Sequence, residues 1–417
     1  MALSKKPVNG MKDIMPDEMR IRDYLIDLIK KTYKEFGFTS METPVVESLA
    51  NLTSKQGGDN EKLIFKILKR GEKLKIEEAK TDNDLADSGL RYDLTVPLVR
   101  YYSNHMNDLP KPFKALQIGP VFRADRPQRG RFRQFYQCDI DILGEPSNLA
   151  EIELILATTK LLSRIGFSGF TVVINDRRIL KGMAAWCGFP EDSWDQVFIE
   201  LDKMDKIGMD GVKNNLAESG FGAESIERLG RLFSELAEKE DQVGWLKELL
   251  SECMEEDAAD SLSFIMKSVG ELSSGFSLVF DPTLVRGMSY YTGTIFEIRI
   301  DGLNASCGGG GRYDRMVGKF TNIETPAVGF SIGFERIITI LMEQGFKVPG
   351  EEEAVAFLVE KNMPAERMTQ IMKEAQALRE EGKRVLVSVM NKNRKFQKEQ
   401  LMKEGYKEFR ECYINNL

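Results

Sequence analysis

Hydrophobic and polar positions recur with helical and strand periods in different parts of this 417-residue chain. Residues 17–36 carry apolar side chains at helical spacing: Ile21, Tyr24, Leu25, Leu28, Ile29 and Tyr33. Pro16, followed by two acidic residues, is a typical helix start, and Gly37 is a typical stop. The next segment, FTSMETPVVES, predicts a strand interrupted by Pro44, which suits an edge strand or a bulge.

The pattern between residues 62 and 103 changes several times within a short distance. The sequence KLIFKILKRGEKLKIEE (62–78) predicts a hairpin around Arg70 and Gly71, and the polar AKTDNDLADSG (79–89) predicts a mobile loop. LRYDLTVPLVRYYS then predicts a strand leading into a helix. Such a strand would place Arg91, Asp93 and Thr95 on one face. They are either ordinary polar strand residues, or Asp93 and Thr95 bind an ammonium group.

The remaining pattern predicts an α+β fold, an antiparallel sheet flanked by helices. Two strands with a turn-rich tip at 126–130 are expected within 113–144, followed by an amphipathic helix at 148–167. Strands return at 276–300, and a strand enters a helix within 326–346. The tail from 354 alternates β-α-β-α-β, which favours a small α/β domain with some parallel strands. The predicted domains are a core in two parts, 1–175 and 271–348, a helical insertion at 176–270, and a C-terminal domain at 354–417.

Composition narrows the class of protein. The hydrophobic content of 42% and charged content of 29% are ordinary globular values. No run of eighteen apolar residues and no secretory signal are present in the sequence, so we expect no membrane span. Five scattered cysteines without a CxxC pair favour a reducing, cytoplasmic setting. The single histidine, His105, excludes a multi-histidine metal centre, and we expect no metal held by protein side chains.

One basic stretch stands out in a chain whose net charge is −7. FRADRPQRGRFRQFYQCDIDILG (122–144) places five arginines within eleven residues: Arg123, Arg126, Arg129, Arg131 and Arg133. In a strand, the face shared by Arg131 and Arg133 continues through Gln137 and Asp139 to Asp141. This strand face is either an ordinary solvated face opposite a core face, or a binding face. In the second case, the change from basic to acidic residues along it fits a ligand with one anionic and one cationic end.

Three further motifs carry alternative interpretations. Arg286, in LVRGMSYYTGTIFE, is either part of an irregular strand with a bulge at Gly287 or a second anion-binding arginine. Arg336 lies in the first turn of a predicted helix, where a surface ion pair with Glu335 is the simpler interpretation. CGGGGRYDRMV lacks the P-loop lysine, but its four glycines permit close approach of a flat ligand or of another strand.

Together these pieces resemble the class II aminoacyl-tRNA synthetases, and within them the histidyl-tRNA synthetase family. The stretch from Phe122 is similar to motif 2, GFSIGFER to motif 3, and the Pro16 helix with the Pro44 strand to motif 1. LVRGMSYYTGTIFE and GGGGRYDRMV resemble the two histidine-specific peptides of that family. The resemblance spans about residues 8–345.

The resemblance implies a reaction and its participants. L-histidine and ATP, with Mg²⁺, would give histidyl-adenylate, and the histidyl group would pass to tRNA(His); a homodimer is also implied. The arginines Arg123 and Arg286 would be catalytic at the α-phosphate, and Arg131, Arg133 and Arg336 would join Arg123 in binding ATP. Residues matching histidine-binding positions are Asp93, Thr95, Gln137, Asp141, Arg286, Tyr290, Tyr291 and Tyr313. Gln128 and Arg129 would touch the tRNA acceptor end.

Two departures from the family pattern leave an alternative open. Ser289 stands where the first histidine peptide usually has an acid, and the C-terminal domain is about a strand and a helix shorter than the family's anticodon-binding domain. The alternative is a non-catalytic paralogue that serves as a regulatory subunit in histidine biosynthesis. The presence of Arg123, Arg286 and Arg336 favours the enzyme.

Overall fold

The computed structural model describes residues 3–53, 63–127, 132–272, 275–286, 290–300, 306–350 and 353–415. The chain divides into two compact units, one comprising Met1–Lys12 and Ile26–Thr339 and the other Asp13–Leu25 and Ile340–Leu417. The divisions fall within the helices α1 (Pro16–Glu35) and α13 (Phe334–Glu343). Helix α1 confirms the period seen in the sequence.

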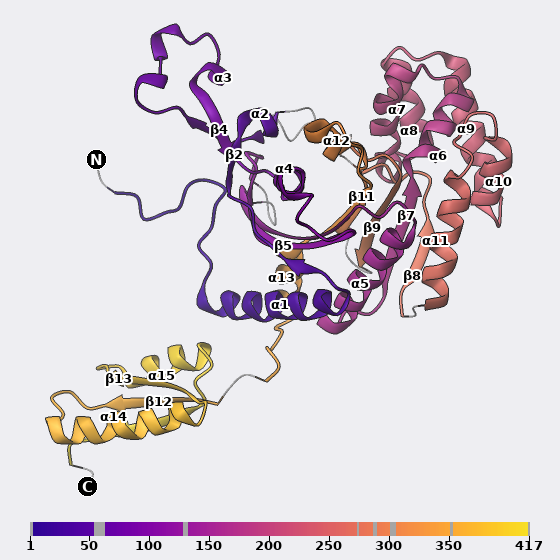
Figure 1. Cartoon of the computed structure of the whole chain (residues 1–417). Coiled ribbons are helices and arrows are strands. Elements are labelled where there is room, and N and C mark those ends of the chain that lie inside the picture. The colour runs from indigo at the N-terminus through magenta and orange to yellow at the C-terminus, as the bar shows by residue number, and fades with distance from the viewer. Residues whose placement is uncertain are drawn as a thin grey trace. The chain divides into compact units, whose positions relative to one another are not determined.

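An eight-stranded sheet forms the centre of the larger unit (Figure 1). Its strands, in spatial order, are β1 (Thr39–Ser40), β5 (Phe113–Phe122), β6 (Gln134–Leu143), β11 (Ala327–Ile332), β10 (Ser306–Arg312), β9 (Thr294–Ile300), β7 (Phe170–Asp176) and β8 (Ser277–Phe280). The two outermost pairs are parallel and the pairs between them are antiparallel. The predicted α+β class with a helix-flanked antiparallel sheet is therefore confirmed.

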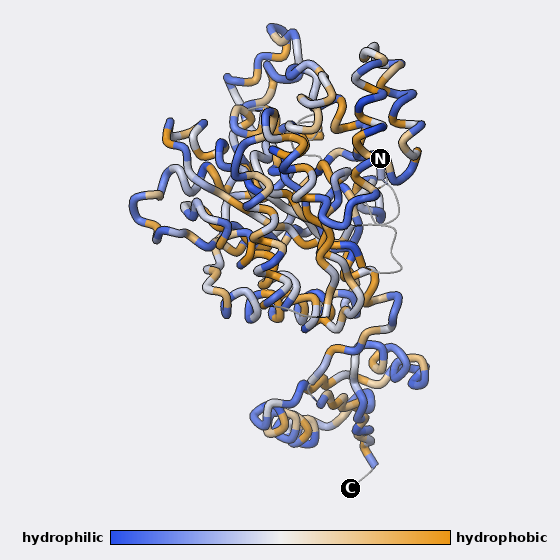
Figure 2. The backbone as a smooth tube through the Cα atoms, turned by 90° about the vertical axis from the view of Figure 1, so that its right-hand side faces the viewer, coloured by the Kyte–Doolittle hydropathy of each residue, from blue (hydrophilic) through white to orange (hydrophobic). Residues whose placement is uncertain are grey.

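The helix α5 (Leu149–Ile165) packs against β6 and β11 of this sheet, and α4 (Thr95–His105) packs against α12 (Arg315–Thr321). Phe296 of β9 and Phe330 of β11, the strands on either side of β10, stack with ring centroids 5.2 Å apart. A buried ion pair fixes α5 to β10, because Arg312 donates from Nε and Nη2 to the two carboxylate oxygens of Glu151 at 2.7 and 2.8 Å. Figure 2 shows hydrophobic stretches interleaved with hydrophilic ones along the chain.

A second, three-stranded sheet corrects two predictions for residues 62–89. It consists of β2 (Val46–Ser48), β4 (Ala86–Leu90) and β3 (Lys66–Leu68), with α2 (Leu49–Leu52) and α3 (Asp82–Leu85) nearby in sequence. The predicted hairpin around Arg70 is wrong, because β3 pairs with β4 and the chain after Gly71 forms 3₁₀ turns at Gly71–Lys73 and Ile76–Glu78. The predicted loop contains α3, whose start is fixed by hydrogen bonds between Thr81 and Asp84.

Six helices occupy the described part of the chain between the parallel strands β7 and β8. They are α6 (Arg177–Cys187), α7 (Trp194–Leu201), α8 (Met204–Glu218), α9 (Ala223–Ala237), α10 (Gln242–Leu249) and α11 (Ala258–Leu272), with a 3₁₀ turn at Glu191–Ser193. Figure 1 shows them gathered beside the β7 and β8 side of the sheet. The predicted helical character of this region is confirmed, while its boundaries as a separate domain stay a prediction.

The smaller unit contains a parallel sheet of β13 (Arg384–Val389), β12 (Ala354–Val359) and β14 (Glu408–Cys412) with α14 (Ala365–Glu380) and α15 (Arg394–Lys403). The central strand β12 is buried on both faces. Phe357 belongs to the cluster that includes Ile371 of α14, whereas Leu358 packs with Leu401 of α15. The predicted β-α-β-α-β order and its parallel strands are confirmed.

Candidate active site

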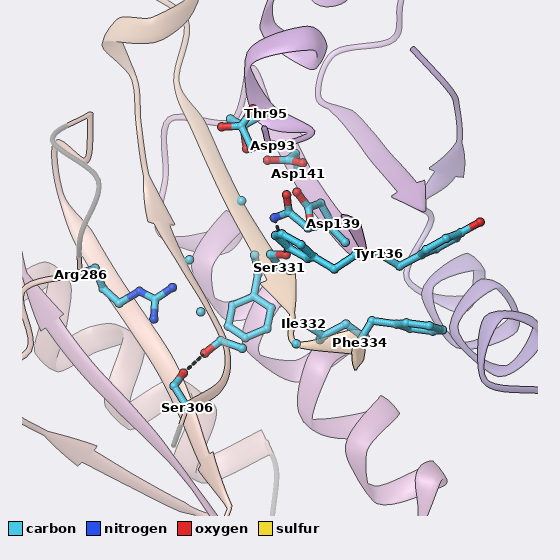
Figure 3. Close-up of a pocket in the computed structure, with 18 of the residues that line it drawn as sticks. Asp93, Thr95, Tyr136, Asp139, Asp141, Arg286, Ser306, Ser331, Ile332 and Phe334 are labelled. Carbon is cyan, nitrogen blue, oxygen red and sulfur yellow. Dashed lines mark hydrogen bonds between the residues drawn. The ribbon is translucent and has the colours of Figure 1, made fainter. Parts of the chain in front are cut away.

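One pocket in the larger unit brings together residues from β6, β10, β11 and the loops beside them (Figure 3). Ten of the residues predicted for the site line it: Asp93, Thr95, Arg123, Gln137, Asp141, Arg286, Tyr290, Tyr291, Tyr313 and Arg336. These residues are spread over more than 240 positions of sequence, and the sheet order places their strands side by side. Figure 3 shows Asp93, Asp139 and Asp141 on one side, with Arg286 extending toward the same space from the other.

The strand β6 supplies the acidic wall. Its alternating residues Gln137, Asp139 and Asp141 line the pocket, and the two aspartates are only 3% and 2% exposed. The residues between them, Cys138 and Ile140, are fully buried on the opposite face. The interpretation of this strand as a solvated face over a core face is therefore wrong for Cys138–Leu143, where both faces are buried.

Asp93 and Thr95 reach the pocket from a helix start instead of from a strand. The strand β4 ends at Leu90, and Thr95 is the first residue of α4. Oδ1 of Asp93 accepts a 3.1 Å hydrogen bond from the backbone N–H of Val96, which satisfies a donor that the first helical turn leaves open. The predicted common strand face with Arg91 is wrong for this reason.

Arg91 lies behind the pocket and is 1% exposed. Its guanidinium donates to the carbonyl oxygens of Thr43 and Pro120 at 2.7 and 3.0 Å. Residue 119, a glycine, makes room for it, because a Cβ there would overlap Nη2 of Arg91. Burial raises the pKa of Asp93 to about 6, and the hydrogen bond from Val96 and the charges of Arg123 and Arg91 oppose this shift.

Asp141 makes a buried side-chain hydrogen bond within the pocket lining. The hydroxyl of Tyr313 donates to Oδ1 of Asp141 at 2.5 Å. Burial raises the pKa of Asp141 to about 7, against the lowering effect of that hydrogen bond. Gly329, opposite Asp141 in the β6–β11 register, leaves the space for the carboxylate, because a Cβ there would overlap Oδ1.

Arg286 faces the acidic wall across the glycine strand β10. It adopts a positive φ of 59°, which residues with a side chain rarely occupy and which the surrounding structure must hold in place. Nη1 donates to Glu297 at 3.2 Å, and a Cβ on Gly309 would overlap the guanidinium carbon. The glycine run thus allows close approach both of Arg286 and of strand β11, where a Cβ on Gly310 would overlap the carbonyl oxygen of Gly329.

Arg123 and Arg336 add two further cations to the lining. Nε of Arg123 donates to the carbonyl oxygen of Tyr92 at 2.9 Å, and its guanidinium lies 5.2 Å from the ring centre of Phe135. Arg336 lies in the first turn of α13, as predicted, and its side chain borders the pocket. Its neighbour Glu335 accepts a hydrogen bond from the backbone N–H of Tyr136.

Four buried acceptor oxygens in this pocket have no hydrogen-bond partner among the described residues: Asp93 Oδ2, Gln137 Oε1, Asp139 Oδ1 and Asp141 Oδ2. Burial of an acceptor without a donor carries a substantial free-energy penalty. All four line one pocket and all four need a donor. The pocket therefore suits a ligand with two different ends. One end would donate N–H groups to the four acceptor oxygens, and the other would carry negative charge that binds Arg123, Arg286 and Arg336.

Four predicted residues lie elsewhere or outside the described part of the chain. Arg133 does not line the pocket, because Nε donates to the carbonyl oxygen of Asp125 and Nη1 to that of Asn9. Its role at ATP stays a prediction. Gln128, Arg129 and Arg131 lie outside the described residues.

Sequence reasoning missed several polar lining residues, among them Asp139, Ser331 and Glu335. The strand alternation already placed Asp139 between Gln137 and Asp141, and this signal was sufficient to include it. Ser331 pairs with Asp139 across the sheet and accepts a 3.1 Å hydrogen bond from Nε2 of Gln137. No sequence pattern predicts that cross-strand contact, because β6 and β11 are about 190 residues apart.

Among the described residues, no group of three or more histidine, cysteine, aspartate or glutamate side chains is placed to hold a metal ion. The same part of the chain contains no helix that is long and apolar enough to cross a membrane.

Comparison with known proteins gives a consistent family. The model of the family described as histidyl-tRNA synthetase matches residues 10–337. A relative from Leifsonia xyli subsp. xyli (strain CTCB07), named histidine–tRNA ligase, is 41% identical over 98% of this chain and 95% of its own length. Another of that name, from Porphyromonas gingivalis (strain ATCC BAA-308 / W83), is 38% identical over 90% of this chain and 84% of its own length.

Solved structures agree with this family. The crystal structure of histidyl-tRNA synthetase from Nostoc sp. PCC 7120 has a TM-score of 0.78 and 28% identity, over 97% of this chain and 90% of that one. A Bacillus halodurans C structure titled as an ATP phosphoribosyltransferase regulatory subunit/histidyl-tRNA synthetase has a TM-score of 0.74, over 99% of both chains, but only 20% identity, which shows a shared fold alone. Because the family model spans most of the sequence and the relatives match it nearly end to end, this chain belongs to the histidyl-tRNA synthetase family.

Proposed function

We propose that this protein is a histidine–tRNA ligase, which activates L-histidine with ATP and transfers the histidyl group to tRNA(His). The observation that carries the proposal is the set of four unpaired buried acceptors facing three arginines. Histidine presents an ammonium group and an imidazole N–H to acceptors, and its carboxylate and the phosphates of ATP suit arginines. Relatives at 36–41% identity are named histidine–tRNA ligase, so the regulatory-subunit alternative is not favoured.

The amino-acid side of the site divides into two parts. Asp93, Thr95 and Gln137 hold the α-ammonium group, because all three line the pocket and Asp93 and Gln137 each have a buried acceptor oxygen without a partner among the described residues. Asp141, oriented by Tyr313, accepts the imidazole N–H, and Tyr290 and Tyr291 enclose the ring. A ligand without that N–H leaves a buried carboxylate unpaired, which is a strong basis for discrimination.

The activation step needs stabilisation of negative charge more than proton transfer. A carboxylate oxygen of histidine attacks the α-phosphorus of ATP, the bond to the bridging oxygen breaks, and pyrophosphate leaves. Arg123 and Arg286 stabilise the α-phosphate from two sides, and Arg336 holds the distal phosphates. The held, positive-φ geometry of Arg286 supports this assignment, since a fixed donor loses less entropy when the reaction begins.

Mg²⁺ fits this site as part of its nucleotide substrate. The described side chains form no metal cage of their own, whereas the phosphates of ATP supply oxygen ligands of the kind that Mg²⁺ prefers. Bound in this way, Mg²⁺ would neutralise part of the charge on the β- and γ-phosphates. The proposal also includes a homodimer, which the family suggests. It includes a cytoplasmic location as well, which the scattered, unpaired cysteines favour.

The test is histidine-dependent exchange between ATP and pyrophosphate, followed by charging of tRNA(His). We expect exchange with the native protein and a loss of at least about a hundredfold for Arg286→Ala, as for removal of a donor that stabilises transition-state charge. Arg299→Ala is the matched control, because Arg299 bonds the same Glu297 but does not line the pocket. Native protein without exchange would contradict the proposal. Exchange without charging would place the defect at the C-terminal domain or the helical insertion.

A further inference from the structure

Asp139 is a buried carboxylate in the pocket to which the proposed function gives no task. It lies on β6 between Gln137 and Asp141, on the same strand face, and it is 3% exposed. Its Oδ1 has no hydrogen-bond partner among the described residues. Figure 3 shows the carboxylate beside Asp141 and next to Ser331.

The neighbours of Asp139 hold its carboxylate in place but leave one of its oxygens without a hydrogen-bond donor. Nε2 of Gln137 donates to the hydroxyl oxygen of Ser331 at 3.1 Å, which leaves the hydroxyl hydrogen of Ser331 for another acceptor. Burial and the charge of Asp141 raise the pKa of Asp139 well above its ordinary value, and the hydrogen bond from Ser331 opposes this shift. Gln137, Ser331 and Asp139 therefore form a chain of hydrogen bonds. Within it, Oε1 of Gln137 and Oδ1 of Asp139 have no hydrogen-bond partner among the described residues.

On its other side, Asp139 pairs in register with Gln117 of β5. Gln117 is already engaged, because Nε2 donates to the carbonyl oxygen of Leu94 at 3.1 Å and Oε1 accepts from the hydroxyl of Thr43 at 3.4 Å. Gln117 also does not line the pocket. The open oxygen of Asp139 is thus left for a ligand.

The open acceptors match the donors of histidine in number. The α-ammonium group carries three N–H donors and a neutral imidazole carries one. The pocket has four unpaired acceptors, and Asp141 is the one that Tyr313 orients for the ring. Asp93 Oδ2, Gln137 Oε1 and Asp139 Oδ1 remain for the three ammonium hydrogens.

We propose that Asp139 is a substrate-binding residue that accepts the third hydrogen of the amino-acid α-ammonium group, beside Asp93 and Gln137. This inference rests on the proposed function and extends it. Two carboxylates then face one cation, so the site binds the protonated amine and rejects analogues that lack it. Asp139 acts on the ammonium end of histidine, and Asp141 acts on the ring.

The test compares Asp139→Asn with Asp141→Asn by calorimetric titration of three ligands. The ligands are histidine, histidinol, which keeps the amine but lacks the carboxylate, and 3-(imidazol-4-yl)propionate, which lacks the amine. We expect Asp139→Asn to weaken histidine and histidinol about ten- to a hundredfold and to leave the propionate within about twofold, in line with loss of a hydrogen bond to a charged group. Asp141→Asn should weaken all three.

Ser331→Ala provides a second variant that keeps both aspartates. It should weaken histidine and histidinol three- to tenfold, again without effect on the propionate, because it removes only the group that orients Asp139. Equal weakening of the propionate, or unchanged histidine binding in both variants, would overturn the inference. Those outcomes differ from failure of the proposed function, which would show as absence of histidine-dependent exchange in the native protein.

Discussion

The hydroxyl of Tyr313 and the carboxylate of Asp141 are joined by a 2.5 Å hydrogen bond between residues 172 positions apart. Both side chains are almost completely buried, and the bond leaves the other carboxylate oxygen open to the pocket. Tyr313 thus determines which oxygen of Asp141 meets a ligand.

Tyr313→Phe should weaken histidine recognition and spare ATP. Loss of the hydroxyl removes a hydrogen bond to a charged acceptor, worth about 1.5–3 kcal/mol, so we expect the KM for histidine to rise at least about tenfold. The measurement is exchange kinetics with histidine varied at saturating ATP, and then the reverse. Tyr101→Phe is the control, because Tyr101 packs on His105 and Phe113 and does not line the pocket. An unchanged KM for histidine would contradict the assignment of Asp141.

Gly329→Ala should damage the site more than the fold. The new methyl group overlaps Oδ1 of Asp141 and lies 3.1 Å from the ring of Tyr313, so the carboxylate must move. We expect a loss of more than about tenfold in kcat/KM for histidine, with destabilisation of about 1–3 kcal/mol from overpacking. Gly318→Ala in α12 is the matched control, since its nearest heavy atom lies 3.6 Å away. Equal effects of the two changes on kcat/KM would contradict this account.

Arg91→Met should destabilise the larger unit by about 2–4 kcal/mol, because two buried carbonyl groups lose their donor and the neighbouring acids lose a compensating charge. Thermal unfolding followed by near-ultraviolet circular dichroism measures the loss. The exposed Arg231 of α9, in the same unit, gives the control Arg231→Met, for which a change below about 0.5 kcal/mol is expected. A similar melting temperature for both variants would show that Arg91 is not needed for the fold.

The free protein should lose stability as the pH rises from 6 to 8. Burial raises the pKa of Asp141 from 3.8 to about 7, so the folded state binds a proton that the unfolded state has already released. Stability from this group is complete below the unfolded pKa and is lost as the pH rises through the folded one, about 1 kcal/mol between pH 6 and 8. Melting temperatures across this range test the sign. The loss should become smaller in Asp141→Asn, and the raised pKa values of Asp93 and Asp139 should leave a remainder of the same sign.

Long periodic elements could be predicted from the sequence because their period alone determines which side is buried. The helix α1 and the strands β5 and β6 are examples. The error at residues 62–89 had another cause, since Lys66–Leu68 is too short to show which partner it pairs with. The helix start at Thr95 was predictable, because Asp93 three residues before Val96 and Pro97 in the first turn are both start signals.

The site was predictable in its residues but not in its contacts. Resemblance indicated Asp141 and Tyr313 separately, while their hydrogen bond depends on the β6–β11–β10 order that no local pattern contains. The burial of Arg91 could not be predicted from the sequence either. An arginine among polar residues gives no sign that Gly119 and two carbonyl groups will enclose it.

The carboxylate of Asp93 has one oxygen on the amide of Val96 and the other open to the pocket. One delocalised group therefore connects a backbone amide to whatever occupies the site. A cation that draws electron density toward Oδ2 weakens Oδ1 as an acceptor, and the Val96 amide resonance would shift in a nitrogen–proton correlation spectrum. The protein thus contains its own spectroscopic reporter of occupancy, on an amide that itself touches no substrate.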